Sequence, residues 1–171
     1  TVAVQPYARL SISGGGTKTL AGNITPTGDL TVSGGTFDLA TFTANRASAG
    51  GTLTLSDGAT LRIGSTNSRP SNYNTHSIGA TSTVEYYGSN QAIGALNSLQ
   101  SYGHLTLSGS GTKIFPSGTT GISGTLSISG VSVDATSNSP TIDFNRGGSQ
   151  TIPAIDYRNL SLSNSGTKTF A

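Results

Sequence analysis

Residues 157–170 read YRNLSLSNSGTKTF, and residues 7–20 (YARLSISGGGTKTL) and 102–115 (YGHLTLSGSGTKIF) repeat this string without a gap. The shared pattern is Y-x-x-L-[ST]-[IL]-S-x-x-G-T-K-x-[LF]. Three copies of so long a pattern indicate tandem duplication. We expect its fixed residues to be structural, with the tyrosines packed at corners of the fold. These residues are Tyr7, Leu10, Lys18, Tyr102, Leu105, Lys113, Tyr157, Leu160 and Lys168.

The spacing of the copies indicates a smaller unit. The interval from Tyr7 to Tyr102 exceeds the interval from Tyr102 to Tyr157 by two units of about 20 residues. Leucines that open short alternating runs recur at a similar interval, first at Leu10, Leu30 and Leu53, and again at Leu105 and Leu126. A unit of roughly 20–23 residues is typical of one coil of a parallel β-solenoid, in which each coil packs on its neighbours.

The alternating runs themselves predict strands. Apolar residues two positions apart alternate with Ser, Thr, Asp or Arg, which is the period of a half-buried strand, and glycines between the runs suit turns. We therefore predict an all-β parallel β-solenoid (β-helix) of about eight coils, forming one segment over residues 1–171. The runs are Leu10/Ile12, Leu30/Val32, Leu53/Leu55, Leu61/Ile63, Leu105/Leu107, Leu126/Ile128, Val131/Val133 and Leu160/Leu162.

The long repeats divide this segment into residues 1–95, 96–150 and the start of a further repeat at 151–171. Residues 1–21 and 151–171 align with each other, and neither carries a polar cap that would block pairing at a strand edge. We therefore expect further coils to stack on both ends, from adjoining repeats or from copies of the chain.

Two places depart from the regular pattern. Residues 65–81 (STNSRPSNYNTHSIGAT) are poor in apolar side chains and include Pro70, which cannot donate to a strand ladder, so we predict a loop that protrudes from the side. Lys18 falls on the same face as Leu20. A corner with an exposed lysine is the favoured interpretation, and a lysine stem lying along an apolar edge is the alternative.

Composition argues against several classes of function. The chain has no cysteine, which excludes thiol nucleophiles and Cys-based zinc sites, and its nine basic residues are scattered, which argues against nucleic acid as a partner. No apolar stretch approaches the ~20 residues of a membrane span. Asp29 and Asp57 are 28 residues apart and Asp134 and Asp143 are nine apart, so neither pair has the spacing of one coil. Neither His76 nor His104 lies in a metal-ligand motif. We expect no enzyme, no catalytic residue, no cofactor and no metal.

A candidate ligand site lies in the predicted loop. Arg69, Asn72, Tyr73 and Asn74 could stack on and hydrogen-bond a sugar, which makes surface glycans possible partners and a carbohydrate-binding or carbohydrate-cleaving β-helix the alternative function. Thr-x-Thr pairs, such as Thr17/Thr19 and Thr52/Thr54, raise ice binding as a third candidate. Uneven steps between the pairs predict that they lie on different faces.

The repeat string resembles the repeat arrays of very large secreted surface proteins of Bacteroidetes-type bacteria that use the type IX export route. More broadly it resembles filamentous-haemagglutinin-like β-helical adhesins and fibres. The resemblance implies an extracellular, cell-surface location and a role in attachment, biofilm or motility. We therefore expect a structural segment of a surface fibre or adhesin, acting as a stiff stalk with stackable ends.

Overall fold

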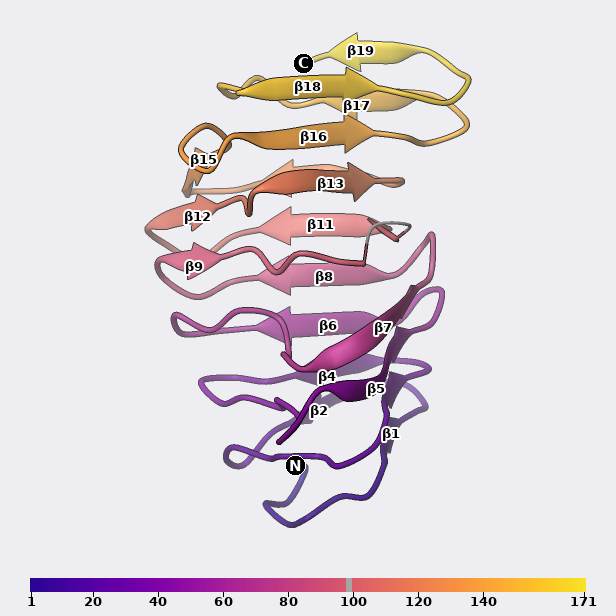
Figure 1. Cartoon of the computed structure of the whole chain (residues 1–171), viewed down its shortest axis with the longest axis vertical. Helices are drawn as coiled ribbons and strands as arrows, with labels where there is room; N and C mark the ends of the chain where they lie inside the picture. Colours follow the sequence, from indigo (N-terminus) through magenta and orange to yellow (C-terminus); the bar gives the residue numbers. More distant parts are fainter. Residues whose placement is uncertain (98–99) are drawn as a thin grey trace.

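The computed structural model describes residues 1–97 and 100–171. In them the chain winds as a parallel β-solenoid of about eight turns without a helix, which confirms the predicted fold. The turns stack along the long axis from the N-terminus to the C-terminus (Figure 1). None of the described residues forms a helix that could span a membrane.

Short strands form the sides of each turn. Most of them have two to four residues because turn residues soon follow each alternating run. In chain order they are β1 (Leu10–Ile12), β2 (Thr17–Thr19), β3 (Leu30–Val32), β4 (Thr36–Asp38), β5 (Gly50–Leu55), β6 (Thr60–Ile63), β7 (Tyr73–Ile78), β8 (Thr83–Tyr86), β9 (Gln91–Ala92), β10 (Ser101–Tyr102), β11 (His104–Leu107), β12 (Thr112–Ile114), β13 (Gly118–Ile122), β14 (Leu126–Ile128), β15 (Ser132–Asp134), β16 (Pro140–Phe144), β17 (Gln150–Ile152), β18 (Asn159–Leu162) and β19 (Lys168–Phe170).

The strands join their equivalents in neighbouring turns as parallel sheets. The sheet orders are β1-β3-β5-β7, β10-β13-β16-β18, β14-β11-β8-β6-β4-β2, β15-β12-β9 and β17-β19. Leu10, Leu30 and Leu53 are register partners, and so are Leu105 and Leu126, as their spacing predicts.

The coils vary more in length than the sequence pattern predicts. The step from Ile142 to its register partner Leu160 is among the shortest, and the step from Thr36 to Thr60 is the longest between paired strands of the described chain. The turns absorb this difference, so the strands stay in register. The three copies of the repeat also lie in three different sheets, since Leu10 is in β1, Leu105 in β11 and Leu160 in β18.

Apolar side chains from all turns meet in one interior column. Leu30, Phe37, Leu61, Leu105 and Ile142 are among the residues with at most 1% of their surface exposed. Each turn buries its inward residues against the turns on either side, because one turn is too thin to cover them alone.

The turn inside the repeat requires two left-handed residues in every copy. These are glycines or asparagine, whose backbone adopts positive φ most readily, which explains why Asn164 can replace glycine in the last copy. The angles are 70° and 73° at Gly14 and Gly16, 85° and 67° at Gly109 and Gly111, and 59° and 96° at Asn164 and Gly166.

The prediction of a protruding loop over residues 65–81 was wrong for the second half of this segment. Residues Tyr73–Ile78 form β7, which pairs in parallel with β5. His76 is the register partner of Leu53 and is buried like it, so a histidine fills a core position that the apolar pattern does not reveal.

Candidate functional site

The predicted sugar-binding residues do not form a stacking surface. Tyr73 is only 5% exposed, and its hydroxyl donates to the carbonyl oxygen of Ala44 at 3.1 Å. The Arg46 guanidinium carbon lies 5.9 Å from the centre of the ring. Burial raises the pKa of Tyr73 to about 12. The ring is part of the core, so the prediction that it stacks on a sugar was wrong.

Two of the other three residues of this predicted site hydrogen-bond the backbone. Asn72 donates to the carbonyl oxygen of Arg46 at 2.8 Å, and Arg69 donates to the carbonyl oxygens of Pro70 and Ala95 at 2.8 and 2.6 Å. Asn74 is exposed. Through Asn72 and Arg69 the segment ties neighbouring coils together.

The favoured interpretation placed Lys18 at a corner as an exposed residue, but Lys18 is half-buried in β2, and the lysines of the other two copies are not exposed either. Lys113 is fully buried, and its ammonium donates to the carbonyl oxygens of Gly88 and Ser89, both at 2.7 Å, and to Gln91 Oε1 at 2.8 Å. Burial lowers the pKa of Lys113 from its usual value of 10.5. The carbonyl oxygens of a tight turn converge, and the long lysine stem reaches them along the interior.

The other two copies of this lysine bind turns as well. Lys168 donates to the carbonyl oxygen of Gly148 in the preceding coil at 3.2 Å. Lys18, in the first coil of the structure, donates to the carbonyl oxygens of Gly14 and Gly15 in its own turn. The repeat therefore encodes an ammonium that holds a turn.

Two buried glutamines complete these turns and were missed in the sequence. Gln91 is the register partner of Lys113, and Gln150 is the register partner of Lys168. Gln91 Nε2 donates to the carbonyl oxygen of Ile63 at 3.0 Å, and Gln150 Nε2 donates to that of Ile122 at 2.8 Å. The sequence feature that could have revealed them is a glutamine about one coil before the Thr-Lys pair of the second and third copies.

The repeat tyrosines hold the chain that enters each strand. The Tyr7 hydroxyl donates to the carbonyl oxygen of Ala3 and the Tyr157 hydroxyl to that of Pro153, both at 2.8 Å. The fully buried Tyr102 donates to the carbonyl oxygen of Gly94 in the same way.

A ladder of charges crosses the outer face of the six-stranded sheet. Arg62 donates to Glu85 Oε2 at 2.7 Å and to Asp38 Oδ2 at 3.1 Å, and its guanidinium lies 4.2 Å from the centre of the Tyr87 ring. Hydrogen bonding to Glu85 raises the pKa of Arg62. Asp38, Arg62 and Glu85 belong to the neighbouring strands β4, β6 and β8, so the ladder ties successive coils together.

Threonines form a second column beside this ladder. Thr17, Thr36, Thr60 and Thr83 are successive register partners, while Thr52 and Thr54 lie in β5 of another sheet. The pairs Thr17/Thr19 and Thr52/Thr54 therefore lie in different sheets, in agreement with the prediction that the pairs do not share one face. The column adjoins the charged residues, so this face is not a lattice of hydroxyls alone.

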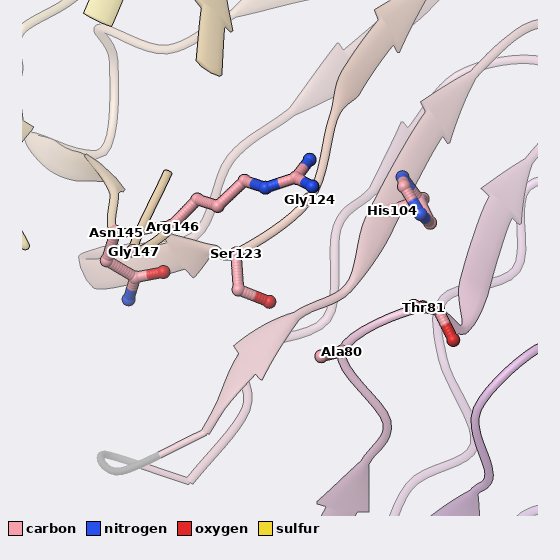
Figure 2. A pocket seen from close by; sticks show the side chains of 8 residues that line it. All are labelled: Ala80, Thr81, His104, Ser123, Gly124, Asn145, Arg146 and Gly147. Carbon is pink, nitrogen blue, oxygen red and sulfur yellow. The ribbon is translucent and has the colours of Figure 1, made fainter. Parts of the chain in front are cut away.

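A hollow of about 260 Å³ opens at one corner of the solenoid, and we call it the corner hollow. Figure 2 shows its lining side chains, which come from successive coils. Ala80 and Thr81 lie in the turn before β8, and His104 begins β11. The complete lining is Ala80, Thr81, His104, Ser123, Gly124, Asn145, Arg146 and Gly147.

Glycines bring the coils close together beneath this hollow. A Cβ atom at Gly124 would lie 2.3 Å from the carbonyl oxygen of Gly103, and one at Gly103 would lie 2.5 Å from that of Gly79. The corner therefore tolerates no side chains at these places, and the surface stays concave there.

The polar groups of the corner hollow have different partners. His104 Nδ1 accepts the N–H of Thr125 at 3.2 Å, which puts the proton of a neutral ring on Nε2. Asn145 Nδ2 donates to Ser101 Oγ at 2.8 Å, whereas Asn145 Oδ1 is buried without a partner among the described residues. Arg146 is exposed. Across residues 1–97 and 100–171, no three His, Asp or Glu side chains gather as a metal site requires.

Neither histidine lies in a site that the sequence pattern describes. His76 is 6% exposed, and its Nδ1 accepts the N–H of Asn97 at 3.0 Å. Burial, with a smaller contribution from the charge of Arg69, lowers the pKa of His76 to about 4. His104 lines the corner hollow, and sequence spacing gave no sign of this.

Comparisons of the chain with models of known protein families, with curated proteins and with solved structures find no match.

Proposed function

We propose that the chain is a stiff structural segment of an extracellular surface fibre or adhesin, with the solenoid acting as its stalk. The observation that carries this proposal is the parallel stacking of β2, β4, β6, β8, β11 and β14 in one continuous sheet. Each coil adds about 4.8 Å of hydrogen-bonded length, so a rod grows in proportion to its number of coils.

The ends of the solenoid support stacking as a part of this function. Val4, Leu162 and Phe170 are the large apolar residues that stand exposed in the described part of the chain, at 58%, 44% and 59%. They lie in the first and last turns, where no further coil covers them. An adjoining repeat or a second copy would cover them and extend the ladder in an open, head-to-tail arrangement.

The test is sedimentation velocity over a range of protein concentrations. The unchanged chain should form larger species as its concentration rises, and a Leu162→Lys/Phe170→Lys variant should not, because lysine is costly in an apolar contact. A Ser127→Lys/Ser129→Lys variant, with the same added charge on exposed positions in the middle of the rod, is the matched control. A monomer at all concentrations, or equal assembly of both variants, would contradict stacking.

The stalk role has its own measurement. Electron micrographs of tandem fusions of two and four copies should show straight rods whose length doubles. Bent or collapsed particles would count against a stiff stalk even if stacking were observed.

A further inference from the structure

We propose that the corner hollow binds the carboxylate of a uronic acid unit in a polysaccharide. Four neighbouring coils build this hollow, and the close approach of their backbones at Gly103 and Gly124 fixes its floor. A concave surface with a fixed floor, mostly apolar but carrying a few polar groups, is a typical ligand site. At about 260 Å³ it is smaller than sites for drug-sized ligands, so it suits a single sugar ring.

Arg146 supplies the positive charge for a carboxylate. Its side chain extends along the hollow past Ser123 toward Gly124 (Figure 2). Within the described residues the guanidinium takes part in no ion pair, in contrast to Arg9 and Arg62, which face carboxylates. A planar guanidinium binds a carboxylate through two parallel hydrogen bonds.

His104 adds a second donor from the neighbouring coils. Because Nδ1 accepts the backbone N–H of Thr125, the neutral ring carries its proton on Nε2. Among the described residues Nε2 makes no hydrogen bond, so this N–H is available to an oxygen of the ligand.

Two hydroxyl groups of the lining distinguish a sugar acid from a simple anion. Thr81 donates its hydroxyl to Asp57 at 3.0 Å, and Ser123 donates its hydroxyl to the carbonyl oxygen of Tyr102 at 3.1 Å. Each oxygen can still accept a hydrogen bond, so the hydroxyls of a sugar have acceptors in the hollow. Inorganic phosphate at neutral pH and a peptide carboxylate carry no comparable set of hydroxyl donors beside the acid.

The Asp57 carboxylate, which is bonded to Thr81 of the lining, gives the ligand a direction. Asp57 accepts the backbone N–H and the hydroxyl of Thr81 at 2.9 and 3.0 Å, and these bonds lower its pKa. Asp57 therefore stays ionised at the Thr81 end, whereas Arg146 lies in a coil farther along the axis. The acid group of the sugar faces Arg146, and its hydroxyls face Thr81.

The test is a titration of the ¹⁵N-labelled chain with sodium glucuronate, followed by NMR at low salt. We expect saturable shifts at Gly124, Arg146 and Gly147, with an affinity in the millimolar range that is typical of one small contact. Glucose tests the need for the acid, and sodium glutamate tests a peptide-like carboxylate. Both should bind at least about tenfold more weakly than glucuronate.

Three variants locate the site. Arg146→Gln should weaken glucuronate binding about tenfold, and Ala80→Trp should block the hollow without removing a hydrogen bond. Arg158→Gln removes another exposed arginine, which lies outside the hollow, and should leave binding unchanged. Equal losses in Arg146→Gln and Arg158→Gln, equal binding of glucose or of glutamate, or no saturable shifts would each overturn the proposal.

Discussion

The middle and last copies of the repeat follow the same residue pattern, but neighbouring coils cover them differently. Leu107 and Phe115 in the middle copy are fully buried, whereas their counterparts Leu162 and Phe170 are 44% and 59% exposed. Strand β11 pairs with β8 on one side and β14 on the other, while β18 pairs only with β16 among the described residues.

This difference shows that the stability of a repeat depends on the coils that pack on either side of it. A buried leucine or phenylalanine contributes about 1.5–3 kcal/mol through apolar surface removed from water, and only a coil on each side removes all of it. In a solenoid the free energy of unfolding is therefore concentrated in the contacts between coils. Identical sequence changes should have unequal effects in the two copies.

The largest difference in the free energy of unfolding between equivalent substitutions is expected for the phenylalanines of the two copies. Phe115→Ala should lower the free energy of unfolding by about 4 kcal/mol, because it leaves a cavity between coils. Phe170→Ala should lower it by less than about 1 kcal/mol, because solvent already reaches that ring. Urea unfolding of both variants measures the difference. Equal losses would show that the last coil is as well packed as the middle one.

The second largest expected effect is that acid destabilises the interior of the rod. His76 continues the inward column of Leu10, Leu30 and Leu53 and stays neutral in the folded chain. Between its ordinary pKa of 6.5 and its folded pKa of about 4, the unfolded chain takes up a proton that the folded chain does not. Stability is therefore complete above about pH 6.5 and falls as the pH decreases toward 4, by on the order of 3 kcal/mol.

A His76→Leu variant tests that acid effect, because leucine occupies the same position in the three preceding coils. Its urea midpoint should change less between pH 7.5 and pH 4 than that of the unchanged chain. If both midpoints fall equally, another group carries the acid sensitivity.

The same comparison for the repeat lysines should give a smaller difference in the free energy of unfolding. Lys113→Met keeps the length of the side chain but leaves the carbonyl oxygens of Gly88 and Ser89 without their buried donor, at a cost of about 2 kcal/mol. Lys168→Met should cost about 0.5 kcal/mol, because water can replace its ammonium at a half-exposed turn. Thermal unfolding of the pair provides the measurement. A larger loss for Lys168→Met would contradict this account of burial.

Much of the fold could be predicted because register follows the apolar alternation. The pairs Leu10–Leu30–Leu53 and Leu105–Leu126 were recognisable as equivalent positions from spacing alone. The sheet in which each copy lies was not, because turns of different length shift the copies around the solenoid. Polar residues in the interior were missed for a second reason: His76, Gln91 and Lys113 are buried through hydrogen bonds that periodicity does not report.

The corner hollow could not be predicted from sequence at all. Its residues come from segments that lie far apart in the chain, from Ala80 to Gly147, and each is ordinary in its own stretch of sequence. They meet because they occupy the same corner in successive coils. Tyr73 is an error of the opposite kind, a ligand residue that the sequence predicted and the structure does not have. Its neighbours are polar, but its alternation with Asn72 and Asn74 directs the ring inward.

The smallest expected effect compares two ion pairs, one inside the stack and one near its first turn. Arg62 lies between Asp38 and Glu85, whose side chains are 12% and 21% exposed, whereas Arg9 is 82% exposed and lies 3.8 Å from Asp29. Arg62→Gln should lower the free energy of unfolding by about 1 kcal/mol, because two poorly solvated carboxylates lose their counter-charge. Arg9→Gln should change it by less than about 0.3 kcal/mol. Urea unfolding at 0.05 and 0.5 M NaCl checks both values. Since neighbouring coils shield the inner pair from salt ions, its contribution should persist at high salt, and an effect of Arg62→Gln that vanished there would mean that the ladder behaves as an ordinary surface pair.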